Sequence, residues 1–553
     1  MVVAGHLHKR KARIEFMKYR TIIGFMYKAA ERLRMVFAIA GLLLILNLPD
    51  NPADLGVEHF IKLPIELLGV VLLLTATRGK YFQSARLAVT MILASVLVLK
   101  LADMATYTAF SRQFNPLFDA KLLFDGWIVL NATLGAIQAF FLVSATLLCL
   151  ILTIALVYWS LGAFQSAGGR RPLALVSGLC LLVIPAIASY HPNNKFIETR
   201  TIKLIVDRVA LVEKSWRDRH EFAALLGSDP IADIPQNGRF EALKGKDVVV
   251  IFIESYGESV IRDPNYSKLT EKRLAQVEQQ ISAAGLTSRS SWLVSPTSGG
   301  LSWLAHGTLL SGVWVDSQQR YDQLIASERP SLNLLFKQAG WRSVAVMPAI
   351  TMDWPESDYF RYDKVYAANN LGYHGKPFNW VTMPDQYTLS AFQKFERAGP
   401  HSPVMAEIAL ISSHAPWTPI PKLIDWSAIG DGLIFNEQAV VGDAPEVVWQ
   451  DQERVRTQYA SSIDYTLETL GSYMAKYGSN TVFILLGDHQ PAPIITGNGA
   501  SRAVPVHIVS DDPALLERLD PKKWNPGMTP GNQQAEPMDG FRQELLREFC
   551  NPA

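Results

Sequence analysis

The chain has 553 residues, of which 49% are hydrophobic, and this length allows two or more domains. Its 52 basic and 51 acidic side chains give a formal net charge of +1. A charge balance of this kind gives no indication of a nucleic-acid partner, and we expect none.

Long apolar runs are concentrated in the first third of the chain. Most approach the roughly 20 residues that a helix needs to cross a bilayer. One such run is often a buried helix of a soluble protein, but a soluble core does not readily bury several in succession. The sequence therefore predicts an α-helical membrane domain at residues 1–190 with about five spans: Met35–Leu48, which is short, Leu63–Ala76, Ala85–Leu101, Trp127–Leu161 and Pro172–Tyr190.

Basic residues predict the orientation of these spans. Nine Lys and Arg lie between Lys9 and Arg34, before the first run, and this pattern is typical of an uncleaved anchor with a cytoplasmic N-terminus. Trp127–Leu161 is long enough for two short spans, which would place the C-terminal domain in the cytoplasm. We expect one long, tilted helix instead, because the run has no Pro, charge or turn cluster at its middle. Five spans then place the rest of the chain outside the cytoplasm, as in a multi-pass inner-membrane protein.

Residues 191–245 are expected to connect this domain to the next one. Apolar residues at helical spacing, among them Ile202, Ile205 and Val209, predict a helix over Thr201–Leu226. This helix either lies along the membrane surface or packs as an ordinary amphipathic helix. Beyond it, Cys550 is the only cysteine, so we expect an exported domain without an internal disulfide.

From residue 246 to residue 553 the pattern changes to short apolar runs separated by helical stretches. Continuous apolar runs of this length are typical of strands buried on both faces, and their alternation with helices predicts an α/β domain with a mainly parallel sheet. In such sheets ligands bind at the edge formed by the carboxyl ends of the strands. The predicted strands are Asp247–Ile253, Ser343–Met347, Val404–Ile411, Thr481–Leu486 and Val504–Val509.

Acidic residues and histidines, which can all bind a metal ion, follow three of these strands. Glu254 follows the first, His414 follows the third, and Asp488 and His489 follow the fourth. A single acid of this kind is often a helix cap, but carboxylates and imidazoles gathered at one edge are suitable ligands for a divalent cation. The segment SPTSGGLSWLAHGTLLSG, between the first two predicted strands, brings several hydroxyls to the same edge, and a hydroxyl beside a metal ion is a good nucleophile.

Together these motifs resemble the alkaline phosphatase superfamily. More narrowly, they are similar to its membrane-anchored, sulfatase-like branch of lipoteichoic-acid synthases and related phosphoglycerol and phosphoethanolamine transferases. In DVVVIFIESYGESVI and LLGDHQP the resemblance implies that Glu254, Asp488 and His489 bind the metal. In IALISSHAPWTP it implies that His414 contacts the substrate, and in DWPESDYFRYDKVY, where the usual Arg is absent, it implies that Trp354 and Asp353 line the pocket.

The resemblance also indicates which hydroxyl of this segment is the nucleophile. In the superfamily the nucleophile stands ten residues before a Gly, usually with Ser or Thr at the ninth place and a large apolar residue at the seventh. Counted from Ser302, these places hold Gly312, Ser311 and Leu309. Ser302 is therefore the expected nucleophile and a further metal ligand, with Thr297 as the second candidate, although the transferase branch usually has Thr at this position.

The residues after Ser302 argue against a sulfatase. Sulfatases place Pro and Arg two and four residues after their nucleophile, whereas this chain has Leu304 and His306 there. His306 either assists proton transfer or packs the loop.

The resemblance thus implies a metal-dependent enzyme, with at least one Mn or Zn ion. It would transfer a phospholipid headgroup, phosphoglycerol first, through a covalent Ser302 intermediate to a glycan or glycolipid acceptor outside the cytoplasm. The alternatives are a phosphoethanolamine transferase, a hydrolytic phosphodiesterase or phosphatase of the same fold, and a non-catalytic membrane sensor or scaffold.

Overall fold

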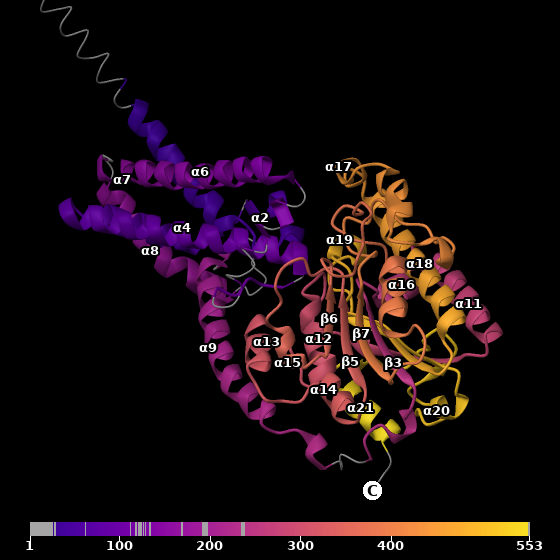
Figure 1. Ribbon diagram of the computed structural model, residues 1–553. Coiled ribbons are helices and arrows are strands. Elements are labelled where there is room, and N and C mark those ends of the chain that lie inside the picture. Colours follow the sequence, from indigo (N-terminus) through magenta and orange to yellow (C-terminus); the bar gives the residue numbers. More distant parts are fainter. Residues whose placement is uncertain are drawn as a thin grey trace, which may run out of the picture. The chain divides into compact units, whose positions relative to one another are not determined.

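The computed structural model describes residues 26, 29–60, 62–110, 112–116, 119, 124, 126–127, 129–131, 134–166, 170–190, 197–198, 200–233 and 238–550. These residues form two separate compact units. The first takes the described residues up to Tyr107, residues 112–115, and those from Leu134 to Glu213. The second takes Lys214 to the end of the described chain, with the short segments 108–111 and 116–133. Figure 1 shows the elements of both, and each unit is described here by itself.

The first unit is helical. Residues 29–47 form its first helix, and α3 (Ile65–Ala76), α4 (Gly79–Phe110), α6 (Ala136–Leu161) and α8 (Arg170–Tyr190) follow. Among the described residues, two helices are long and apolar enough to cross a membrane, namely Gly79–Phe110 and Ala136–Gln165. α3 and Arg171–Val183 are apolar but shorter. These two helices are a weak sign of membrane insertion by length and composition, and the five predicted spans stay a prediction.

The long apolar run from Trp127 to Leu161 is not one continuous helix, contrary to our expectation. Gly135 takes a φ of 81°, a left-handed backbone conformation that glycine adopts without steric cost, and α6 begins at the next residue. Its 26 residues span about 39 Å at 1.5 Å per residue, which is enough for one crossing.

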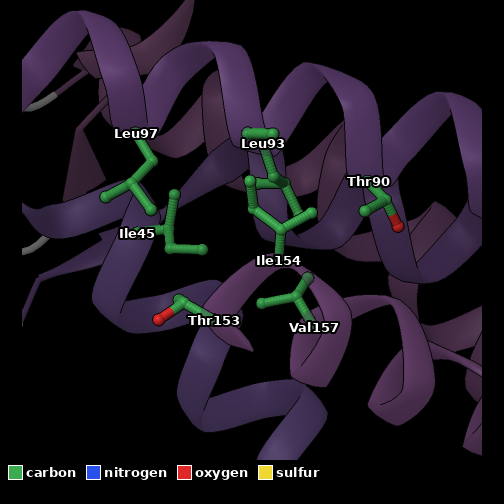
Figure 2. Close-up of a pocket in the computed structure, with 8 residues that line it drawn as sticks. Ile45, Thr90, Leu93, Leu97, Thr153, Ile154 and Val157 are labelled. Carbon is green, nitrogen blue, oxygen red and sulfur yellow. The ribbon is translucent and has the colours of Figure 1, made fainter. Parts of the chain in front are cut away.

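The core of this unit contains a small apolar pocket (Figure 2). The two threonines in its wall bond to carbonyl oxygens of their own helices: Thr90 Oγ1 donates to Arg86, and Thr153 Oγ1 donates to Cys149. The wall therefore offers a ligand no free hydroxyl proton. It is lined by Ile45, Thr90, Leu93, Ala94, Leu97, Thr153, Ile154 and Val157.

Two charged side chains of α4 are buried and satisfied. Lys100 Nζ donates to the carbonyl oxygens of Ile45 (3.1 Å) and Leu46 (2.8 Å), which lie in the last turn of the first helix and have no partner within it. Asp103 forms an ion pair with Arg208 of α9 (Arg200–Leu226). The helix predicted over Thr201–Leu226 is thus present as α9, and Ile202, Ile205 and Val209 are exposed on it.

The second unit is built on a nine-stranded sheet with the order β10-β4-β9-β8-β3-β7-β5-β6, in which β11 also pairs with β4. All five predicted strands are present. The sheet is parallel from β8 through β3, β7 and β5 to β6. β9 is antiparallel to β8, and β4 is antiparallel to β9, so the carboxyl end of β9 lies at the opposite edge. The strands are β3 (Asp247–Ile253), β4 (Thr287–Val294), β5 (Arg342–Met347), β6 (Lys364–Ala367), β7 (Val404–Leu410), β8 (Thr481–Gly487), β9 (Ala503–Ser510), β10 (Asn525–Pro526) and β11 (Glu536–Pro537).

Helices cover both faces of this sheet (Figure 1). Along β3 every residue is buried, and alternate side chains enter two separate cores because successive residues of a strand point to opposite faces. Val249 and Ile251 pack in one core with α11 (Ser267–Ala283), α16 (Asp385–Glu396) and α18 (Gln452–Tyr477). Val250 and Phe252 pack in the other with α12 (Ser302–Ser311), α13 (Gln318–Ile325), α14 (Leu332–Gln338) and α21 (Gly540–Phe549). The domain is therefore α/β with a mainly parallel sheet, as predicted.

Candidate active site

Glu254 is the first residue after β3, and its neighbour has an unusual backbone. Ser255 adopts a φ of 57°, a left-handed conformation that is uncommon outside glycine and is found most often at functional sites. Its hydroxyl donates to Glu254 Oε1 (2.8 Å), and Ser413 Oγ donates to the Glu254 carbonyl (2.6 Å). The Glu254 carboxylate is thus held at the carboxyl edge of the sheet.

Asp488 is the first residue after β8, next to β3. Its Oδ1 accepts hydrogen bonds from the backbone N–H of Ser255 (2.8 Å) and of His489 (2.7 Å). The close approach of the two strand ends depends on Gly487, where a Cβ would lie 1.8 Å from the carbonyl oxygen of Tyr256. Two adjacent parallel strands therefore place the two carboxylates side by side.

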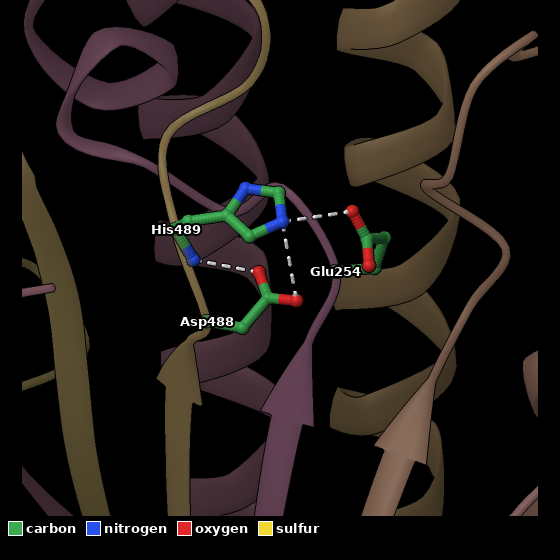
Figure 3. A group of neighbouring side chains, drawn as sticks. All are labelled: Glu254, Asp488 and His489. Atoms are coloured by element: carbon green, nitrogen blue, oxygen red, sulfur yellow. Dashed lines mark hydrogen bonds and ion pairs between the residues drawn. The ribbon is translucent and has the colours of Figure 1, made fainter. Parts of the chain in front are cut away.

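His489 completes this group (Figure 3). Its Nδ1 lies 2.8 Å from the carbonyl oxygen of Gln490, so Nδ1 carries the proton and donates, and Nε2 faces the carboxylates. Nε2 is 3.4 Å from Glu254 Oε1 and 3.7 Å from Asp488 Oδ2. All three side chains are buried.

Ser302 brings a hydroxyl to the same point. It is the first residue of α12, and Leu301 before it has a φ of 63°, again left-handed. Ser302 Oγ lies 3.1 Å from Glu254 Oε2 and 3.2 Å from His489 Nε2. Thr297, the second candidate, instead donates its hydroxyl to the Gly300 carbonyl (2.7 Å) within the loop. The structure thus brings Ser302, and not the Thr297 hydroxyl, to the acidic group.

Burial and mutual proximity set the charges of the two carboxylates. Burial opposes ionisation of Glu254, but His489, His414 and the hydrogen bond from Ser255 outweigh it and lower its pKa to about 2. Burial, and then the charge of Glu254, raise the pKa of Asp488 well above its usual value. Two adjacent buried carboxylates favour a bound cation, which would allow both to ionise.

The residues fit a divalent metal ion. One ligand atom from each of Glu254, Asp488 and His489 lies within 4.8 Å of the others, and the Ser302 oxygen is within hydrogen-bond distance of two of these side chains. Among the described residues, no Lys or Arg forms an ion pair with either carboxylate. Three oxygens and one imidazole nitrogen suit Mn or Zn, and the donor set does not distinguish them.

His306 lies one helical turn after Ser302, and its main partner was not foreseen from the sequence. Its Nδ1 is 2.7 Å from Oε1 of Glu407, a side chain of β7 that is 1% exposed. Its ring stacks on Phe252 of β3, with 3.7 Å between ring centroids. A Glu in the middle of an apolar strand is the signal in the sequence that marks this pair.

His414 also has a partner that the sequence did not indicate. Its ring stacks on the indole of Trp380, with 3.9 Å between centroids and 19° between planes, and its Nδ1 is 2.6 Å from the Ala415 carbonyl oxygen. Its neighbour Ser413 donates to the Glu254 carbonyl oxygen (2.6 Å), which brings this loop to the acidic group. In the sequence Trp380 is simply an aromatic residue in a loop and carries no signal of this contact.

Trp354 and Asp353 follow β5 at the same edge. Trp354 packs against Phe360 and Tyr362, with centroid distances of 6.1 Å to each, and Asp353 is exposed. Among the contacts of the described residues, neither forms a hydrogen bond to Glu254, Ser302, Asp488 or His489. Their role as pocket residues stays a prediction.

Comparison with known proteins gives one family match. Residues 246–503 match the family model "Sulfatase". The chain matches no curated protein.

Similar solved structures have low sequence identity. The lipoteichoic acid synthase LtaP from Listeria monocytogenes is 13% identical, with 53% of this chain and 71% of that chain covered and a TM-score of 0.34. The C-terminal periplasmic domain of EcEptC from Escherichia coli is 14% identical over 55% and 82%, with a TM-score of 0.36. Streptococcus pyogenes phosphoglycerol transferase GacH, in complex with sn-glycerol-1-phosphate, is 13% identical over 60% and 79%, with a TM-score of 0.35. The family match covers the segment that contains Glu254, Ser302, Asp488 and His489, and this segment is therefore similar to sulfatases.

Proposed function

We propose that the chain is a metal-dependent phosphotransferase that moves a phospholipid headgroup, with phosphoglycerol as the first choice, to a glycan or glycolipid acceptor. The observation that carries this proposal is the position of Ser302 Oγ, 3.1 Å from Glu254 and 3.2 Å from His489, at the N-terminus of α12. A hydroxyl held against a carboxylate and an imidazole is the arrangement of an activated nucleophile. The N-terminal amides of α12 also favour an incoming anion.

The reaction has two steps. In the first, Ser302 Oγ attacks the phosphorus of the donor, the bond from phosphorus to the diacylglycerol oxygen breaks, and diacylglycerol leaves with a proton. In the second, the acceptor hydroxyl attacks the same phosphorus, the bond to Ser302 Oγ breaks, and Ser302 regains its proton. Glu254 and His489 are the groups within reach of the Ser302 proton.

A divalent cation, Mn or Zn, would be held by Glu254, Asp488, His489 and the Ser302 oxygen. When bound, it supplies positive charge where negative charge develops on the oxygens of the reacting group. His414, whose ring is fixed against Trp380, would orient the headgroup or its phosphate.

The two main alternatives differ from the proposed function in the headgroup or in the acceptor. A phosphoethanolamine transferase would use the same residues with a different headgroup. A hydrolytic phosphodiesterase or phosphatase would use water in the second step. A non-catalytic sensor is disfavoured because Glu254, Ser302, Asp488 and His489 all lie together.

A lipid donor also agrees with the proposed location. We place the chain in the inner membrane with several spans and residues 246–553 outside the cytoplasm, where a lipid and an acceptor sugar meet. The two helices long enough to cross a bilayer support insertion.

Diacylglycerol release tests the proposed function. The full chain in detergent would be incubated with phosphatidylglycerol or phosphatidylethanolamine and Mn or Zn, and diacylglycerol measured by mass spectrometry. Wild type and Thr297→Ala are expected to release it, whereas Ser302→Ala is expected to lose at least about 10³-fold in rate. Equal release by Ser302→Ala and wild type would contradict the proposed mechanism. Free glycerophosphate formed without an acceptor would favour the hydrolase.

A further inference from the structure

Glu407 is a buried carboxylate in the middle of β7, and its partners all come from the α12 side of the sheet. A carboxylate in such a place is costly unless it is hydrogen-bonded or paired. Its Oε1 is 2.7 Å from His306 Nδ1, and its Oε2 accepts from Asn333 Nδ2 (3.3 Å) and from the Tyr362 hydroxyl. Among the described residues, no Lys or Arg is paired with it. Among the described residues, His306 is therefore its one basic partner.

His306 is held on two sides by these contacts. Phe252 stacks on its ring with an interplanar angle of 16°, and the Glu407 carboxylate is within hydrogen-bond distance of its Nδ1. Its side chain is 12% exposed, and it follows Ser302 by four residues, which places both on one face of α12. Nε2 is the nitrogen that remains for the site.

The three histidines near Ser302 differ in what holds their second nitrogen. His489 and His414 place Nδ1 against backbone carbonyl oxygens, of Gln490 and Ala415. Only His306 among them has a carboxylate there. A carboxylate on one nitrogen fixes the orientation of the ring and thus the direction in which Nε2 points.

We propose that Glu407 is a positioning residue for His306, and that it holds the ring so that Nε2–H donates a hydrogen bond to the phosphoryl group carried by Ser302. This inference rests on the proposed function. The reacting group gains negative charge as Ser302 attacks, and a hydrogen bond from Nε2–H stabilises that charge. Tyr362 and Asn333 orient the carboxylate of Glu407 and thus act one step further from the substrate.

A double-mutant cycle tests whether Glu407 acts through His306. The full chain would be assayed with bis(p-nitrophenyl) phosphate and Mn as Glu407→Gln, His306→Ala and the double variant. We expect Glu407→Gln to lower kcat by about 10- to 100-fold and His306→Ala by at least as much. In the His306→Ala background, Glu407→Gln should change kcat by less than about threefold, because its effect has no other route.

Two further measurements separate positioning from folding. Glu396→Gln is the matched control, because Glu396 is also buried and bonded to a tyrosine (Tyr366), but its cation is Arg342. It is expected to lower Tm with kcat changed by less than about threefold. The inhibition constant of inorganic phosphate should rise severalfold in Glu407→Gln and His306→Ala, and stay unchanged in Glu396→Gln.

The outcomes are distinguishable. Independent, multiplicative losses in the double variant, or a loss of Tm in Glu407→Gln without a change in phosphate inhibition, would overturn the positioning role. If Glu407→Gln does not fold, Tyr362→Phe removes one donor and leaves the carboxylate, and its smaller loss of kcat must vanish in the His306→Ala background. Full activity of Ser302→Ala would instead overturn the proposed function itself.

Discussion

Arg542 of α21 anchors the end of the helix that begins with Ser302. Its side chain is 0% exposed. Its Nη1 donates to the carbonyl oxygen of Ser311, the last residue of α12 (2.7 Å), and its Nη2 is 2.8 Å from Asp229 Oδ2. A cation at a helix C-terminus satisfies carbonyl groups that have no partner in the helix and opposes the helix dipole.

The contacts of Arg542 allow an estimate of how much its substitution lowers the free energy of unfolding. Removing one partner of a buried ion pair costs about 3–5 kcal/mol. Arg329 reduces this cost, because its Nε also donates to the Ser311 carbonyl (2.8 Å) and its Nη2 lies 3.7 Å from Asp229. We therefore expect Arg542→Ala to lower the free energy of unfolding by about 2–4 kcal/mol and the Tm by about 3–6 °C.

Thermal unfolding of the full chain, followed by tryptophan fluorescence, measures this change. Arg547→Ala is the matched control on the same helix, since Arg547 is 62% exposed and its ion pair within the described part of the chain is with its neighbour Glu548. An exposed pair of this kind contributes about 0.5 kcal/mol or less, so its Tm should be close to that of wild type. If the two variants lost the same Tm, the proposed role of Arg542 as the anchor of α12 would be wrong.

Three further predictions concern the strand ends, the pH dependence of stability and the metal. Gly487→Ala would place a Cβ 1.8 Å from the Tyr256 carbonyl oxygen, so we expect a loss of about 3 kcal/mol or more, measured as Tm or as loss of folded protein. The Gly399 carbonyl and then Asp247 raise the pKa of His401, so this interaction stabilises the fold below about pH 6.5 and its contribution is lost as pH rises through the folded-state pKa. The Tm difference between wild type and His401→Gln should therefore be largest near about pH 5.5 and vanish by about pH 8.5, and a difference that grows with pH would contradict this sign. Dialysis against EDTA should abolish diacylglycerol release and lower Tm, and Mn or Zn should restore both in wild type but not in Glu254→Gln.

The strands of the second unit were predictable where burial is complete. β3, β7 and β8 are continuous apolar runs, and each has the predicted position. β4 was missed because its sequence TSRSSWLV contains hydroxyls, one of which, Ser290 Oγ, bonds to the buried His507. The antiparallel direction of β9 was not predictable. An apolar run indicates a buried strand, but it does not indicate whether that strand runs parallel or antiparallel to its neighbours.

The candidate site was predictable where its residues directly follow the end of a strand. Glu254, Asp488 and His489 stand directly after two strands, and parallel pairing of β3 with β8 brings them together. Glu407 and Trp380 were missed because their roles depend on contacts made across the fold. A Glu inside a strand and a Trp inside a loop do not reveal which histidine they hold.

The central claim is that Ser302 carries the transferred group, and peptide mapping of the covalent intermediate tests it most directly. The full chain, incubated with phosphatidylglycerol or phosphatidylethanolamine and Mn, would be acid-quenched and analysed by intact mass and by peptide mapping, beside Ser302→Ala and Thr297→Ala. We predict a glycerophosphate or phosphoethanolamine adduct on Ser302 in wild type and Thr297→Ala, and none in Ser302→Ala. An adduct on Thr297, or one that persists in Ser302→Ala, would contradict the account.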